Sequence, residues 1–163
     1  MNEVLDHSSN DTGIDPYGRF FKAQDNDGFC GLYAVQNLLK NDNIYPNDLD
    51  QSALAVSKMT GDPLSNHADV DGYWSADTLS TYLNSVGYDV DYTNVIDFEN
   101  DQLCGYIVHI ERRFHYICLR RSTRQHGKIE ICDSQRGIET LDVSEVKHRA
   151  TKEQWNFFSV RCT

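Results

Sequence analysis

Four side chains spread along the chain have the types and the order that catalysis by a thiol requires. Cys30 begins an apolar segment predicted to be helical, where the positive end of the helix dipole favours a thiolate. Gln24 lies a few residues upstream, and its side-chain amide could serve in an oxyanion hole. His115 and Asp133 lie far downstream on strand-like segments. We therefore predict a cysteine hydrolase in which His115 removes the proton of Cys30 and Asp133 orients the imidazole ring.

Each of these residues also has an ordinary structural interpretation. A cysteine at the start of a helix is most often an apolar filler of the core. A histidine in a strand is usually satisfied by a backbone carbonyl, and Asp133 followed by Ser134 is typical of a turn. The catalytic interpretation therefore depends on all four residues occurring together in this order.

Three amphipathic helices are predicted in the first half of the chain. Residues 31–40 carry apolar side chains at helical spacing and define a wide buried face. We expect a second helix to be capped by Asp48 and to end at Gly61. A third is expected to be capped by Ser75 and to end at Gly87, a residue suited to the left-handed conformation.

After Gly87 the hydrophobic period changes from helical to two, which indicates strands. The expected strands are residues 88–92, 106–110, 114–120, 129–132, 138–141 and 155–162. Helices followed by an antiparallel meander predict an α+β domain with its N-terminal helices packed on the sheet. We expect His115 and Asp133 on neighbouring strands, where facing Cβ atoms lie roughly 5 Å apart.

Composition limits the classes of partner. The chain has 163 residues, enough for one domain, and a net charge of −10 from 25 acidic and 15 basic residues. Acidic side chains repel phosphate backbones, so nucleic acid is not an expected partner. No apolar run has the length of a membrane span, and no membrane partner is expected. We expect a flexible arm over residues 1–18 and a single, monomeric domain over residues 19–163.

The cysteines indicate a reducing compartment. Cys30, Cys104, Cys118, Cys132 and Cys162 show neither the paired spacing of a disulfide scaffold nor a zinc-binding pattern. We expect free thiols and a cytoplasmic location, with the nucleus and specialised export into a host cell left open. The predicted chemistry requires no metal and no cofactor.

Two longer stretches resemble the Josephin-type deubiquitinases, which belong to the papain-like cysteine proteases. Residues 30–39, Cys-Gly-Leu-Tyr-Ala-Val-Gln-Asn-Leu-Leu, are similar to the nucleophile helix of that family. Residues 71–75, Asp-Gly-Tyr-Trp-Ser, resemble its aromatic-Ser entry into a central helix. His115 followed by an aromatic residue, and later Asp133-Ser134, resemble its histidine strand and the Asn-Ser pair at the end of the next. The resemblance extends over roughly residues 22–162.

The resemblance implies a papain-like fold and a thiol-dependent hydrolase acting after the C-terminal glycine of ubiquitin or a ubiquitin-like protein. The implied catalytic residues are Cys30, His115, Asp133 and Gln24. Tyr73, Trp74 and Ser75 are candidates for contact with the narrow tail of ubiquitin, although core packing is the favoured interpretation of the two aromatic residues. His109 has no expected partner and is interpreted as structural.

Two other functions use the same residues differently. A papain-fold deamidase or acyltransferase would direct the triad at a glutamine side chain of a protein. An inactive module would bind ubiquitin without cleaving it, but the presence of all four predicted catalytic residues argues against that alternative.

Overall fold

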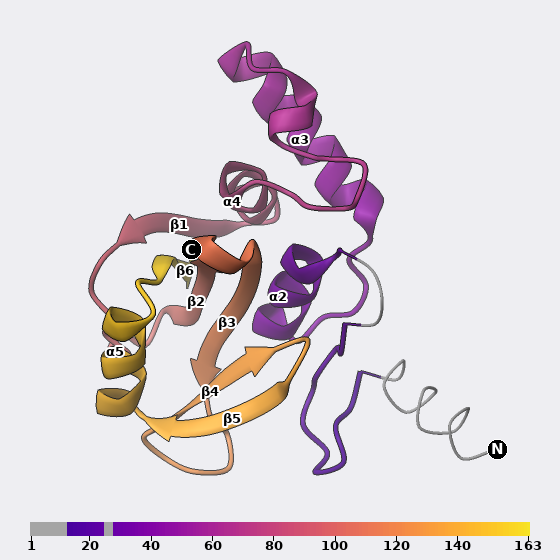
Figure 1. The fold of residues 1–163 in the computed structure, drawn as a ribbon. Coiled ribbons are helices and arrows are strands. Elements are labelled where there is room, and N and C mark those ends of the chain that lie inside the picture. Colours follow the sequence, from indigo (N-terminus) through magenta and orange to yellow (C-terminus); the bar gives the residue numbers. More distant parts are fainter. Residues whose placement is uncertain (1–12, 25–27) are drawn as a thin grey trace, which may run out of the picture.

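A computed structural model describes residues 13–24 and 28–163, which form a mixed α+β fold (Figure 1). The helices are α2 (Cys30–Leu39), α3 (Pro46–Thr60), α4 (Ala76–Ser85) and α5 (Val143–Lys152), with short 3₁₀ segments η1 (Leu64–Asn66) and η2 (Glu111–Arg113). The strands are β1 (Tyr88–Thr93), β2 (Leu103–Ile110), β3 (His115–Arg121), β4 (Lys128–Asp133), β5 (Gly137–Asp142) and β6 (Asn156–Cys162). Within these residues, no helix is both long enough and apolar enough to cross a bilayer.

The six strands form one antiparallel sheet in the order β1-β6-β2-β3-β4-β5. The expected antiparallel meander is confirmed for β2 to β5 but is wrong for the last strand, which inserts between β1 and β2. Phe158 in β6 lies opposite Tyr92 on one side and Ile107 on the other. Its exposed fraction is 1% and that of Val160 is 0%, so the insertion buries these apolar side chains and leaves β6 with a neighbour on each side.

Alternating residues of the strands face two separate cores. Tyr116 and Cys118 of β3 belong to the core shared with α2 and α4. Ile117 and Leu119 point to the other face and belong to the core that α5 covers. In Figure 1, α3 extends away from the sheet, and α5 lies apart from the other helices beside β5.

Helix α5 was not expected from the sequence. Its inward side is narrow, because Val146 and Ala150 are its buried residues and the rest of the helix is mostly charged or polar. Its start is nevertheless well defined, since the backbone N–H of Asp142 donates to the Glu145 carboxylate at 3.2 Å.

The other helix ends agree only in part with the expectation. Ser75 is confirmed as the N-cap of α4, where its Oγ accepts from the Thr78 backbone N–H at 3.1 Å. The N-cap position expected for Asp48 is wrong, because α3 begins at Pro46 and Tyr45 is its N-cap. The Asp48 carboxylate instead accepts from the backbone N–H of Tyr45 at 2.8 Å. Proline suits this first position because its missing N–H has no intrahelical acceptor.

A bulge interrupts the pairing of β2 with β6 between Leu103 and Gly105. Gly105 has φ 152°, and a Cβ atom added there would lie 2.0 Å from the carbonyl oxygen of Leu119. Only a glycine permits this approach of β2 to β3. The bulge also gives Cys104 a position outside the regular pairing.

The expected flexible arm lies mostly outside the described residues, which omit residues 1–12. The part that is described makes defined contacts. Ile14 pairs with Phe20 in an isolated bridge, and the Arg19 guanidinium forms an ion pair with Asp15 at 2.7 Å.

Candidate active site

Cys30 is the first residue of α2 and has an exposed fraction of 4%. The preceding residue, Phe29, is the N-cap and provides no side-chain hydrogen bond to the helix. The backbone N–H groups of the first turn lack intrahelical acceptors. They form the positive end of the helix dipole, which lies at the helix end where Cys30 is located. Gly28 allows the backbone at Asp71 to pack closely against the segment before Cys30, because a Cβ atom at position 28 would lie 2.2 Å from the carbonyl oxygen of Asp71.

His115 and Asp133 are joined across neighbouring antiparallel strands. Nε2 of His115 lies 2.7 Å from Oδ1 of Asp133, and both residues are buried. The β3–β4 register pairs Cys118 with Cys132, and its continuation places Asp133 opposite Ile117. The two side chains are therefore diagonal neighbours rather than directly facing ones. Asp133 also accepts from the backbone N–H of Gln135 at 3.0 Å, which fixes its orientation.

The turn between η2 and β3 contacts the sulfur of Cys30 through the residue before His115. Phe114, the residue before His115, has φ 48°, an uncommon left-handed conformation for a bulky side chain. Its carbonyl oxygen accepts a weak hydrogen bond from Sγ of Cys30 at 3.9 Å. Its side chain is 71% exposed, so this conformation is not explained by burial of the ring. Backbone strain of this kind is often found at functional sites.

The pKa of His115 reports how its neighbours act on it. Burial alone would lower this pKa, but the hydrogen bond to Asp133 and the interaction with Cys30 raise it to about 9. Burial alone would raise the pKa of Asp133, but the hydrogen bonds from His115 and from the Gln135 N–H lower it overall. The guanidinium of Arg113, 3.9 Å from the Asp133 carboxylate, acts in the same direction. The pair is therefore suited to an imidazolium beside a carboxylate.

Gln24 lies beside the same strand end. Its backbone N–H donates to the carbonyl of Ser134 at 2.7 Å, and Oγ of Ser134 donates to its side-chain oxygen at 2.9 Å. The side-chain oxygen is thus held by Ser134, next in sequence to Asp133, which orients the amide group. These contacts place Gln24 beside Asp133, and the oxyanion-hole role expected for its amide stays a prediction. The neighbouring residues 25–27 of the sequence motif are outside the described part of the chain.

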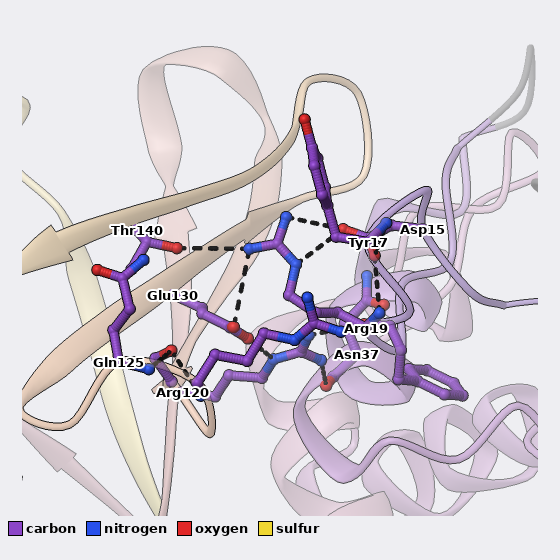
Figure 2. Close-up of polar contacts among 11 residues, drawn as sticks. Asp15, Tyr17, Arg19, Asn37, Arg120, Gln125, Glu130 and Thr140 are labelled. Carbon is purple, nitrogen blue, oxygen red and sulfur yellow. Dashed lines mark hydrogen bonds and ion pairs between the residues drawn. The ribbon is translucent and has the colours of Figure 1, made fainter.

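A buried ion pair anchors the segment that carries Gln24 (Figure 2). Arg120 binds Glu130 at 2.7 Å, and its other nitrogens donate to the backbone oxygens of Phe20 and Asn37. Asn37 in turn accepts from the backbone N–H of Lys22 at 2.7 Å. One guanidinium therefore connects β3, β4, α2 and the segment leading to Gln24.

Arg19 extends this network to the edge of the sheet. It contacts the Asp15 carboxylate and Oγ1 of Thr140, and it approaches Glu130 at 3.9 Å (Figure 2). These contacts attach the segment to β5 as well as to β4.

The three candidates for substrate contact lie in different environments. Trp74 is 2% exposed, and its indole N–H donates to Asp50 at 3.0 Å, so it belongs to the core. The side chain of Ser75 caps α4 and lies 2.9 Å from Nδ1 of His67. Tyr73 is partly buried, and its ring stacks on that of Tyr116 at 5.5 Å between centroids.

His109 has the partner that sequence reasoning did not find. Its Nε2 lies 2.5 Å from the hydroxyl of Tyr73, and its ring stacks on Tyr116 at 4.6 Å. Burial lowers the pKa of His109, which favours the neutral ring as acceptor of the tyrosine proton. The ring of Tyr73 also meets that of Phe114 edge-on at 6.2 Å, so the aromatic cluster reaches the residue before His115.

Ser134 and Phe114 are further parts of the site that the sequence did not single out. The sequence gives Ser134 a place in a turn and in the family resemblance but no contact with Gln24, which lies 110 positions away. The conformation of Phe114 has no sequence signal, since bulky residues rarely adopt positive φ.

The side chains gathered here are a thiol, an imidazole and a carboxylate, which are groups that can serve acid–base and nucleophilic chemistry. Within residues 13–24 and 28–163, no group of three or more His, Cys, Asp or Glu side chains is placed to hold a metal ion. No protein-family model matches the sequence, and no curated protein matches it either.

Proposed function

We propose that this chain is a cysteine hydrolase of the papain-like type that cleaves the bond after the C-terminal glycine of ubiquitin or a ubiquitin-like protein. One arrangement supports the proposal: Nε2 of His115 lies 2.7 Å from the Asp133 carboxylate, and Sγ of Cys30 lies 3.9 Å from the carbonyl oxygen of Phe114, the residue before His115. A nucleophile, a base and a group that orients the base are the parts that such chemistry needs.

The proposed mechanism gives each side chain a role. Asp133 engages Nε2 of His115, which leaves Nδ1 as the ring nitrogen that exchanges a proton with the sulfur. Cys30 attacks the carbonyl carbon, and His115 then protonates the leaving amine of the substrate lysine. Water hydrolyses the resulting thioester, with His115 acting as the base. In both tetrahedral intermediates, the Gln24 amide and the Cys30 backbone N–H stabilise the oxyanion.

The substrate class is supported by the resemblance of residues 30–39 and 71–75 to the Josephin-type deubiquitinases. Phe114 is consistent with a protein substrate, because its largely exposed ring lies directly before His115. Aromatic side chains are enriched at protein–protein interfaces, and an exposed ring at this position fits a protein substrate.

The proposal is tested by cleavage of ubiquitin that carries a fluorogenic amide at its C-terminus. We expect turnover by the full chain, loss of turnover in Cys30→Ala, and retention of turnover in Cys162→Ser, which alters an exposed cysteine outside the site. Folded protein that does not cleave the conjugate contradicts the proposal. Ammonia release from a protein glutamine would then indicate the deamidase alternative, and ubiquitin binding alone would indicate the inactive module.

A further inference from the structure

Two thiols outside the candidate active site lie in contact. Sγ of Cys104 and Sγ of Cys162 are 3.2 Å apart, closer than the sum of the van der Waals radii of two sulfur atoms, and both cysteines are free. Neither residue takes part in the chemistry proposed for Cys30.

The sheet holds this pair in place. Strands β2 and β6 are antiparallel neighbours, and the backbone N–H of Cys162 donates to the carbonyl of Gln102 at 2.9 Å. The bulge between Leu103 and Gly105 releases Cys104 from regular pairing and allows its side chain to meet that of Cys162. The strand pairing and the bulge therefore place the two sulfur atoms together.

The pair is accessible to small reagents. Cys162 is exposed and Cys104 is partly exposed. The chain also offers an internal contrast, because Cys118 and Cys132 face each other directly on β3 and β4 but are 0% and 1% exposed. That second pair lies in the core and is closed to reagents in the folded protein.

We propose that Cys104 and Cys162 form a redox modification site that low-molecular-weight disulfides of the glutathione type convert to an intramolecular disulfide. The Cys162 thiolate attacks one sulfur of oxidised glutathione, forms a mixed disulfide and releases one glutathione thiolate. The Cys104 thiolate then attacks the Cys162 sulfur and releases the second glutathione. The protein loses two hydrogen atoms, and the oxidant gains them as two thiols.

The local electrostatics support this order of attack. Burial, the hydrogen bond to Cys162 and the charge of Cys162 raise the pKa of Cys104 to about 12, while Arg121 acts in the opposite direction. The more exposed Cys162 is therefore the first nucleophile. Once its sulfur is in the mixed disulfide, it no longer carries a negative charge that retains the Cys104 proton, and Arg121 favours the attacking thiolate.

The consequence is a covalent connection between the last strand and the strand beside it. The disulfide closes the chain between positions 104 and 162 and fastens the C-terminal end of β6 to the start of β2. Closing a loop of this length is expected to stabilise the folded state.

The test uses the full chain with Cys30→Ser, so that the candidate nucleophile does not compete for glutathione. The protein is incubated with oxidised glutathione under native conditions, quenched with acid, and mapped by peptide mass spectrometry. We expect a cross-linked Cys104–Cys162 peptide and little mixed disulfide. Adding Cys104→Ser should increase the Cys162–glutathione mixed disulfide at least about tenfold, because the resolving thiol is absent.

The matched control is Cys118→Ala, which alters the buried pair and should leave the Cys104–Cys162 cross-link unchanged. Equal amounts of mixed disulfide with and without Cys104 would overturn the proposal, as would cross-linking of Cys118 to Cys132 instead. Neither readout depends on hydrolase activity, so the result is independent of the proposed function.

Discussion

Replacing Asp133 by asparagine should lower the pKa of His115 and weaken the folded state over a defined pH range. Asparagine keeps the shape of the side chain and an acceptor oxygen but removes the charge that favours imidazolium. In the wild type the pKa of His115 is raised from 6.5 to about 9. At about 1.4 kcal/mol per tenfold change in a proton equilibrium, this rise corresponds to about 3 kcal/mol in favour of the charged ring.

Most of this free energy should be lost in Asp133→Asn. The hydrogen bond to Asp133 is the largest of the influences that raise the pKa of His115, ahead of Cys30, while burial opposes them. We expect the His115 pKa of the variant to fall towards or below the ordinary 6.5. The side chain of His115 is 3% exposed, so solvent screening has little effect on this value.

The pH dependence follows from the direction of each pKa change. The folded pKa of His115 lies above its unfolded value, so its contribution is complete below about pH 6.5 and disappears as the pH rises through about 9. The folded pKa of Asp133 lies below 3.8, so its contribution is present above that value and is lost as the pH falls through the folded pKa. The variant should therefore be most destabilised, by up to about 3 kcal/mol, between about pH 4 and 6.5.

Two measurements check this prediction. The pKa is obtained from the pH dependence of the imidazole proton resonances of His115, and the free energy of unfolding from urea denaturation at each pH. Asp142→Asn is the matched control, since that carboxylate is exposed on β5 and should leave the His115 titration unchanged. A wild-type His115 that titrates at or below 6.5, or an unchanged pKa in Asp133→Asn, would refute the reasoning.

Three further substitutions test the packing around the site by urea denaturation. Glu130→Ala leaves the buried Arg120 charge without its carboxylate and should cost about 3–5 kcal/mol; a cost under about 1 kcal/mol would contradict the anchoring role. Gly105→Ala places a Cβ atom against a backbone carbonyl at positive φ and should cost about 2–4 kcal/mol, and an unchanged midpoint would be inconsistent with the bulge. Tyr73→Phe removes the hydroxyl bound to His109 and should cost about 1 kcal/mol, whereas a more stable variant would argue against that bond.

Features set by local sequence were largely predictable. The start of α2 near Cys30, the Ser75 cap of α4 and the end of α3 at Gly61 each follow from a few neighbouring residues. The six strands were also located, because alternation of apolar residues is a local signal. One helix start still differs from the expectation: Asp48 is the third residue of α3 and not its N-cap, because the helix begins earlier, at Pro46.

Features set by contacts between distant residues were not predictable from one sequence. The position of β6 between β1 and β2 depends on which strands bury Phe158 best. The sequence of β6 does not itself indicate which strands will pair with it. Likewise, the pairing of Tyr73 with His109 requires the loop before α4 to reach β2. Helix α5 was missed for another reason, because two buried side chains are too few to produce a clear period.

The candidate site combines both kinds of information. The residue types and order of Cys30, His115 and Asp133 suggested a common location, and the antiparallel pairing of β3 and β4 accounts for the histidine–aspartate contact. The supports supplied by Ser134 and Phe114 appear only in three dimensions.

The most direct test of the central claim is labelling by ubiquitin whose C-terminus carries a propargyl electrophile. The electrophile must meet an activated sulfur positioned at the ubiquitin tail, so it reports nucleophile and substrate class together. We expect one covalent adduct, mapped by peptide mass spectrometry to Cys30 and strongly reduced in His115→Ala. Absence of an adduct with folded protein, or an adduct mapped to Cys162 or another cysteine, would contradict the account.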